Sequence, residues 1–210
     1  MTTDAIRKFL SEALKDELPG DLAHDEMSPP KRLKNKRPPA TGYKEAAVAV
    51  VIGLHQEELH FSVIQRPTYD GAHSGQIAFP GGKKDPSDAH LVETACRECF
   101  EEIGLALDAV YHVGKLSPVY IPVSGFELHP FVYVIDAFPS LIPDEREVEE
   151  IYFLPLIKLL DEGNKGLITI EHQPSNTVFD APCFHFGSVQ IWGATAIVLN
   201  ELKYVLRNRF

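Results

Sequence analysis

Hydrophobic positions along the chain follow two patterns, one typical of strands and one typical of amphipathic helices. Residues 46–52 (AAVAVVI) are all apolar and rich in valine, which predicts a strand covered on both faces. Residues 59–66 form a second apolar run after the polar turn 55–58, so the two runs predict a β-hairpin. Shorter strands are expected at 110–117, 130–135 and 150–154.

Three further segments have helical spacing. Residues 4–16 place apolar side chains three and four positions apart, which predicts an amphipathic helix that packs on the main body. Longer helices are expected at 88–103, ending at Gly104, and at 194–207. Strands mixed with helices predict an α/β layered domain, and the chain contains no internal repeat.

The chain between residues 19 and 42 is rich in Pro and Gly, which predicts an irregular linker. We therefore divide the chain into an N-terminal helix with its linker, residues 1–43, and a domain at residues 44–210. The linker contains a basic cluster at 31–37 (KRLKNKR). A solvated loop is the favoured interpretation of this cluster, and phosphate binding is the alternative.

Composition narrows the class of protein. The 210 residues are 44% hydrophobic and 24% charged, which is usual for a compact globular protein. The net charge of −10 disfavours binding to nucleic acid, and a polyanionic substrate would need a counter-ion. No apolar run is long enough to span a membrane. The three cysteines do not form a disulfide framework and nothing resembles a signal peptide, so we expect a cytoplasmic protein.

The candidate chemistry lies in the predicted helix 88–103. Glu98 and Glu102 are four residues apart with Glu101 beside them, so three carboxylates crowd one helical face. A glutamate-rich surface helix is the simple alternative, but a hard divalent cation such as Mg²⁺ or Mn²⁺ would relieve the repulsion. Arg97 can bridge Glu93 and Glu101 and hold the carboxylates in place. Cys96 and Cys99 lie at apolar positions of this helix, so we interpret them as buried thiols rather than a zinc or redox site.

This segment resembles the signature of the Nudix hydrolases. The matching residues are Gly82, Arg97, Glu98, Glu101, Glu102 and Gly104. The signature has a glutamate six positions after its first glycine, where this chain has Asp88, and one extra residue precedes Arg97. We interpret Asp88 as the N-cap of the helix. The resemblance implies an α/β/α sandwich around a mixed β-sheet, with Glu98 and Glu102 as the main metal ligands and Glu101 contributing.

A narrower resemblance, to the coenzyme A diphosphatase branch of that family, covers about residues 44–205. It is carried upstream by an arginine after an apolar run and by the Phe-Pro-Gly-Gly turn with the residues between them, namely Arg66, His73, Gly75, Gln76, Phe79, Pro80, Gly81 and Gly82. Downstream it is carried by 124–126, 129–131, 147–148 and 191–196. Pro67 and Gly71 depart from the branch, because it favours serine and a second arginine at these positions.

Several residues have a simple interpretation besides the functional one. Arg66 can pair with a phosphate oxygen or with a nearby surface carboxylate. His73 can contact substrate or lie in a solvated loop. Gly81 and Gly82 allow a diphosphate to approach the backbone, and they also suit a tight turn after a strand. Trp192 is interpreted as a core or groove anchor before the last helix.

The resemblance implies metal-dependent hydrolysis of a nucleoside diphosphate linked to another moiety. Coenzyme A or acyl-coenzyme A, cleaved to 3′,5′-ADP and a 4′-phosphopantetheine, is the leading substrate. ADP-ribose or a nucleotide sugar is the alternative, favoured by Gly71, and a noncatalytic nucleotide sensor is a lesser one. The general base is expected among the carboxylates of the helix or of the loop 143–150, with Glu147 as the first candidate. The partner is a small molecule, and a homodimer is a reasonable default for such enzymes.

Overall fold

The structure is a computed structural model that describes residues 2–29, 36–68, 74–172 and 177–207. His73, Gly71 and residues 31–35 of the basic cluster lie outside the described residues. None of the helices in the described ranges has both the length and the apolar character needed to cross a membrane.

Eight strands in the described ranges form one main sheet, with the order β3-β2-β1-β7-β5; β4 also pairs with β1, β6 with β7, and β8 with β2. The central strands β1 and β7 are parallel, and their other neighbours are antiparallel, so the sheet is mixed. The strands are β1 (Lys44–His55), β2 (Glu58–Gln65), β3 (Ile77–Ala78), β4 (Gly81–Lys83), β5 (His112–Lys115), β6 (Val119–Ile121), β7 (Phe126–Ala137) and β8 (Glu150–Pro155).

The predicted hairpin is confirmed, because β1 and β2 pair antiparallel across the turn between His55 and Glu58. The strands expected at 130–135 and 150–154 are also confirmed, within β7 and β8. The strand expected at 110–117 is shorter than predicted. A 3₁₀ turn, η1 (Ala109–Tyr111), comes first because Asp108 caps it by accepting a hydrogen bond from the amide of Val110.

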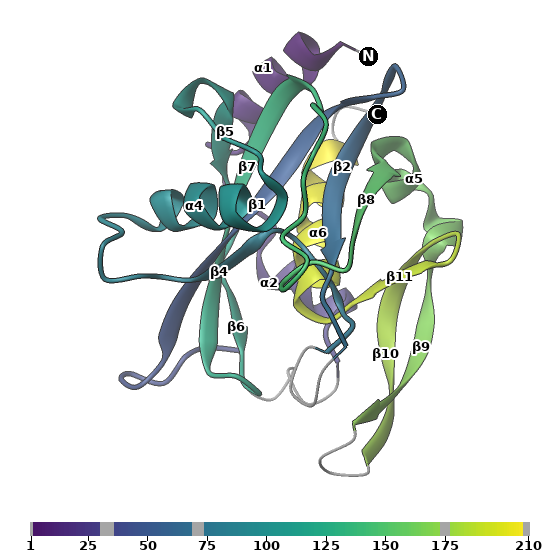
Figure 1. Ribbon diagram of the computed structural model, residues 1–210. Coiled ribbons are helices and arrows are strands. Elements are labelled where there is room, and N and C mark those ends of the chain that lie inside the picture. Colours follow the sequence, from purple (N-terminus) through teal and green to yellow (C-terminus); the bar gives the residue numbers. More distant parts are fainter. Residues whose placement is uncertain (1, 30–35, 69–73, 173–176, 208–210) are drawn as a thin grey trace.

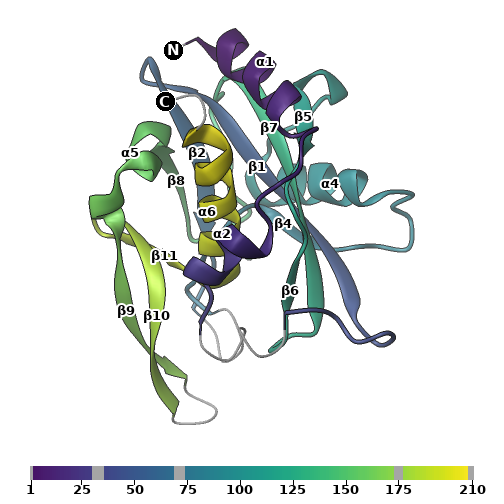
Figure 2. The same cartoon turned by 180° about the vertical axis from the view of Figure 1, so that it is seen from behind.

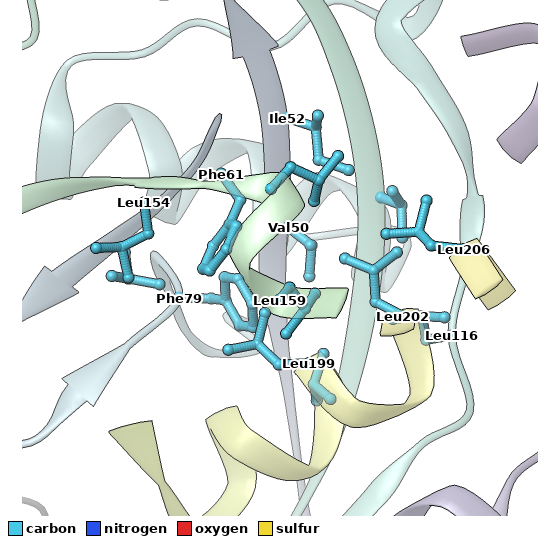
Figure 3. Close-up of a cluster of buried hydrophobic side chains, with 14 of the residues drawn as sticks. Val50, Ile52, Phe61, Phe79, Leu116, Leu154, Leu159, Leu199, Leu202 and Leu206 are labelled. Carbon is cyan, nitrogen blue, oxygen red and sulfur yellow. The ribbon is translucent and has the colours of Figure 1, made fainter. Parts of the chain in front are cut away.

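Helices cover both faces of the main sheet, which confirms the predicted α/β/α sandwich (Figures 1 and 2). Helix α4 lies on one face, and α1, α2 and α6 lie on the other. Valine and alanine side chains of β1 alternate between the two buried clusters, which explains its continuous apolar run. Figure 3 shows the larger cluster, in which Val50 and Phe61 of the sheet face Leu199 and Leu202 of α6. The helices are α1 (Thr3–Ala13), α2 (Asp21–Glu26), α4 (Leu91–Ile103), α5 (Leu156–Leu160), α6 (Gly193–Arg207) and a second 3₁₀ turn, η2 (Glu162–Asn164).

The N-terminal segment packs more closely than the sequence predicted. Helix α1 is confirmed, and its Ile6 and Leu10 are fully buried in the core. The prediction of an irregular linker was wrong at residues 21–26, where α2 packs against α6. Here the amide of Asn200 donates to the carbonyl of Ala23, with N and O 2.7 Å apart. This tertiary contact stabilises a helix too short to be stable by itself.

A second sheet forms an arm at residues 165–192 that projects from the main body (Figure 1). Within the described residues it has three antiparallel strands, β9 (Lys165–His172), β10 (Thr177–Phe186) and β11 (Val189–Trp192), in the order β11-β10-β9. The sequence analysis did not identify these strands. Apolar side chains lie on both faces of β9, so the alternation that marks a half-buried strand is blurred.

Candidate active site

The candidate site begins at a glycine turn between the main sheet and α4. Gly81 has φ +153°, and a Cβ there would collide with the backbone of Ala47 and Val48 on β1. A Cβ at Gly82 would collide with the carboxylate of Glu98. Only glycine therefore allows β4 to lie against β1 while Glu98 lies against the turn.

Helix α4 begins later than predicted. Its N-cap is His90, and Glu93 closes the first turn by accepting a hydrogen bond from the amide of Ala89 at 2.7 Å. The interpretation of Asp88 as N-cap was therefore wrong. The helix ends as predicted at Gly104, whose φ of +69° is the left-handed conformation common after a helix.

Arg97 connects the acidic face of α4 to the loop that precedes this helix. Its guanidinium donates to Asp88 (3.1 and 3.0 Å), Glu98 (2.8 Å), Glu101 (2.9 Å) and the carbonyl of Lys83 (3.2 Å). Arg97 holds the pKa of Asp88 well below its usual range, and Asp88 in turn raises the pKa of Arg97. The expected contact between Arg97 and Glu101 is present, whereas the one with Glu93 is replaced by the helix cap. Arg97 thus fixes the start of the acidic face.

The three carboxylates of α4 have different environments. Glu102 is 1% exposed and accepts a hydrogen bond from the amide of Gly81 at 2.8 Å. Burial raises its pKa to about 8, and the charges of Glu98 and Glu147 add to the effect. Burial also raises the pKa of Glu98. Glu101 has a side chain that is 55% exposed, so it lies at the solvent edge of the group.

Glu147 reaches the same place from a distant loop. The amide of Asp144 donates to the carbonyl of Glu102 at 2.9 Å, and the amide of Ile142 donates to the carbonyl of Ile103 at 3.1 Å. The loop then turns back, because the amides of Glu147 and Val148 both donate to the carbonyl of Asp144. These bonds attach the loop to the C-terminal end of α4 and bring Glu147 beside the buried carboxylates.

A large cleft collects these groups. It has a volume of about 1540 Å³ and is lined by Arg66, Gly81, Gly82, Glu98, Glu102 and Glu147, among others. Nη1 of Arg66 is 3.8 Å from the Glu102 carboxylate, and its Nε is buried without a hydrogen-bond partner among the residues that the structure describes. Among the predicted site residues that the structure describes, Arg97 and Glu101 are the two that do not line the cleft. Arg97 is connected to the lining through its hydrogen bond to Glu98, and it also holds Glu101.

The carboxylates of the cleft are candidate ligands for a metal cation. In the described parts of the chain, no three His, Cys, Asp or Glu side chains form a ready-made metal site. Glu98 is held by Arg97, and Glu102 is held by the amide of Gly81. Their chemistry nevertheless fits a hard divalent cation, because a buried and a partly buried carboxylate with raised pKa values need a positive charge to stay ionised.

The cysteines take no part in this site. Cys99 is buried, and Cys96 lies with its sulfur 3.2 Å from the hydroxyl of Tyr133. Neither thiol is in a disulfide. They pack between α4 and the main sheet, as the interpretation of two buried thiols requires.

Fold and site together define a protein of the Nudix type, with a glycine turn and an acidic helix on a mixed sheet. The family model described as NUDIX domain matches residues 43–171, more than half of the chain. The chain therefore belongs to the Nudix family, and the resemblance inferred from the sequence is confirmed. Residues 172–210, which include β10, β11 and α6, lie beyond the matched range.

Similar proteins include characterised and uncharacterised members. The chain is 39% identical over 129 residues to the mitochondrial coenzyme A diphosphatase NUDT8 of Homo sapiens, covering 61% of this chain and 54% of that protein. It is 31% identical over 172 residues to an uncharacterized Nudix hydrolase, NudL, of Pectobacterium atrosepticum, covering 81% and 87%. The chain thus spans only about half the length of the human relative.

A solved structure supports the fold alone. The crystal structure of a MutT/nudix family protein from Enterococcus faecalis has a TM-score of 0.57 at 15% identity, covering 99% of this chain and 75% of that one. Its similarity extends over nearly the whole chain and agrees with the observed mixed sheet and helices.

Proposed function

We propose that the domain at residues 44–210 catalyses the metal-dependent hydrolysis of a nucleoside diphosphate linked to another moiety. The observation that carries this proposal is the convergence of Glu98, Glu102 and Glu147 on one cleft that Arg66 also lines. Carboxylates at this density suit a cation and a diphosphate better than a neutral ligand. Nudix proteins generally use divalent metal ions, and the donor set here fits Mg²⁺ or Mn²⁺.

Glu98 and Glu102 are proposed as the main metal ligands, and Glu101 is proposed to contribute from the edge. When bound, the cation would neutralise diphosphate oxygens and lower the pKa of the attacking water. Gly81 and Gly82 would let the diphosphate approach the backbone. Arg66 would bind a phosphate oxygen, since its buried Nε has no other partner.

Glu147 is proposed as the general base. It lies on an exposed loop that lines the cleft, and the contacts of that loop with the end of α4 keep it near the metal ligands. A base must reach the water that attacks, so the position of Glu147 across from α4 is the relevant property. Arg97 would act by positioning Glu98 and Glu101 rather than by contacting substrate.

Coenzyme A or acyl-coenzyme A is proposed as the substrate, with 3′,5′-ADP and a 4′-phosphopantetheine as products. The human relative is named as a coenzyme A diphosphatase, and the upstream residues of this chain resemble that branch. Gly71 favours the alternative of ADP-ribose or a nucleotide sugar, because one arginine of the branch is replaced. In the basic linker, Lys36 pairs with Asp25 at 2.5 Å and Arg37 with Asp21 at 2.7 Å, so each already has an acidic partner with which a phosphate would compete.

The test is a substrate panel. The purified chain is incubated with Mg²⁺ or Mn²⁺ and coenzyme A, acetyl-coenzyme A, ADP-ribose, nucleotide sugars or dinucleoside polyphosphates, and the products are identified by mass. Fastest release of 3′,5′-ADP from coenzyme A substrates would support the proposal. Faster cleavage of ADP-ribose or a nucleotide sugar would replace the substrate, and no cleavage at all would favour a noncatalytic sensor.

A further inference from the structure

The cleft has a second wall that the proposed chemistry does not use. This wall belongs to the arm, and part of it lies beyond the range matched by the family model. Four apolar side chains of the arm line the cleft, and we call them the apolar wall: Ile168, Ile170, Phe179 and Trp192. They come from all three strands of the arm.

Strand pairing places these side chains on one face. Ile170 pairs directly with Phe179, and Ile168 lies two residues before Ile170, so all three point to the same side of the arm. Trp192 pairs with Cys183, four residues after Phe179, and therefore shares that face. The rings of Phe179 and Trp192 meet edge to face, with centroids 6.4 Å apart.

The opposite face of the arm differs in exposure. Leu167 is 66% exposed and Val178 is 61% exposed, whereas their neighbours Ile168 and Phe179 are partly buried. Leu167 and Val178 are not among the residues that line the cleft, although Thr169 and Glu171 on the same face of β9 are. The two strands therefore offer apolar residues that belong to the cleft lining and apolar residues that do not.

The apolar wall is connected to the diphosphate end of the cleft. Thr195 follows Trp192 by three residues, and its hydroxyl donates to the carbonyl of Ile77 on β3 at 3.0 Å. Ile77 pairs with Gln65, which directly precedes Arg66. β3 thus links Arg66 to the arm within one cleft. In an acyl-coenzyme A the pantetheine joins the diphosphate to the acyl chain, so with the diphosphate at Arg66 the pantetheine would run along the cleft and carry the acyl chain to the apolar wall.

Other apolar side chains of the cleft come from β6 and β7, namely Ile121, Phe126 and Leu128. The arm also contributes polar side chains to the lining, among them Glu171 and Gln190. A sugar held against the apolar side chains would place hydroxyl groups against carbon, which is unfavourable because their hydrogen bonds to water would not be replaced. A hydrocarbon chain would instead gain from leaving water.

We propose that the apolar wall binds the acyl chain of an acylated substrate and makes the enzyme prefer longer chains. This inference rests on the proposed function, because it assumes cleavage of coenzyme A compounds. It assigns the arm a role in substrate choice and leaves the hydrolytic step to the acidic end of the cleft.

The experiment measures kcat/KM for coenzyme A, acetyl-coenzyme A and hexanoyl-coenzyme A, which share every group except the acyl chain. Burial of a methylene group favours binding about two- to fourfold, so the four extra methylenes of the hexanoyl chain should raise kcat/KM about tenfold or more over acetyl. Phe179→Ala should reduce this ratio to below about threefold, a loss of the size expected for a removed apolar contact. Ile168→Ala is a second, independent variant that removes less volume.

Leu167→Ala is the control matched in size to Ile168→Ala, and Val178→Ala is the neighbouring control for Phe179→Ala, because both Leu167 and Val178 lie on the opposite, exposed face. Both should keep the wild-type ratio. The inference is overturned if Phe179→Ala and Ile168→Ala keep that ratio too, or if they lower kcat/KM equally for all three substrates, which would assign the wall to the nucleotide. Wild-type cleavage of coenzyme A without chain preference overturns the inference alone, and no cleavage of any of the three overturns the proposed coenzyme A substrate with it.

Discussion

At one end of the cleft each buried carboxylate is held by a hydrogen bond, whereas at the other end the arm presents apolar side chains that are held by packing. Glu98 is fixed by Arg97 and Glu102 by the amide of Gly81. The side chains of the apolar wall are held by strand pairing and ring packing instead, and their contact with a ligand would depend on the area that is buried. Directional bonds fail when one atom is displaced, while apolar contact declines gradually with area. We therefore expect abrupt losses at the acidic end and graded changes at the arm.

The largest effect is expected from Glu98→Gln. The amide keeps the shape of the side chain but removes the charge that would bind a cation, so kcat should fall by at least about a hundredfold. Steady-state kinetics with saturating Mg²⁺ measure the loss. Glu145→Gln, on the exposed loop beside the cleft, is the control and should retain activity. A kcat for Glu98→Gln within about tenfold of wild type would remove Glu98 from the metal site.

Gly82→Ala should have the next largest effect. The added Cβ would collide with the Glu98 carboxylate, which is the far end of a side chain and can move. We expect kcat to fall by about tenfold or more while the melting temperature changes by only a few degrees, because the backbone of the turn is not displaced. Activity and thermal unfolding are measured on the same sample. A large fall in melting temperature with unchanged specific activity would show that the turn serves the fold only.

A smaller effect is expected where the arm joins the body, at Glu26. Its carboxylate accepts hydrogen bonds from Lys165 of β9 at 2.8 Å, from Asn200 at 3.2 Å and from Tyr204. Burial raises the pKa of Glu26, but these hydrogen bonds outweigh burial and lower the pKa from 4.5 to about 2. A depressed folded pKa stabilises the protein above the unfolded value and loses that contribution as pH falls through the folded one.

Glu26→Gln should therefore be less stable than wild type at pH 7, by no more than about 1 kcal/mol because the group is partly exposed. The difference should shrink as pH falls from about 4.5 towards about 2. Urea unfolding at pH 7, 4 and 3 measures it, with the exposed Glu12→Gln of α1 as control. A difference that is constant over this range would contradict the assignment.

The smallest effect is expected from replacing Lys36 and Arg37 together by alanine. Both are paired with acidic residues of α2, so the KM for coenzyme A should change less than about twofold and the stability by less than about 1 kcal/mol. A tenfold rise in KM would mean that the described part of the linker binds substrate phosphate after all.

The acidic helix was predictable because its information is local. Helical spacing placed Glu98 and Glu102 on one face, and Gly104 marked the helix end. The prediction that Asp88 is the N-cap was wrong, although aspartate suits that position. Asp88 instead accepts a hydrogen bond from Arg97, nine residues further along the chain. Helix α2 and the strands of the arm depend on tertiary contacts, which short segments do not reveal in sequence.

Glu147 was a candidate from the sequence, but the sequence could not predict that its loop lies against the end of α4. The hydrogen bonds that fix its loop are made by backbone groups of Glu102 and Ile103, and backbone groups carry no sequence signal. Likewise, the face on which Phe179 and Trp192 meet depends on the register of three strands.

The attachment of this loop to the end of α4 has a consequence for how such a protein can change over evolution. The chain leaves α4 at Gly104, passes through three strands of the main sheet and returns to the same helix end at Ile142. Turns within that excursion can lengthen or shorten without altering where Glu147 arrives, because its point of return is set by the helix. The segment between these two points can therefore accept insertions and sequence changes, while the carboxylates of Glu102 and Glu147 at its two ends keep their relative position.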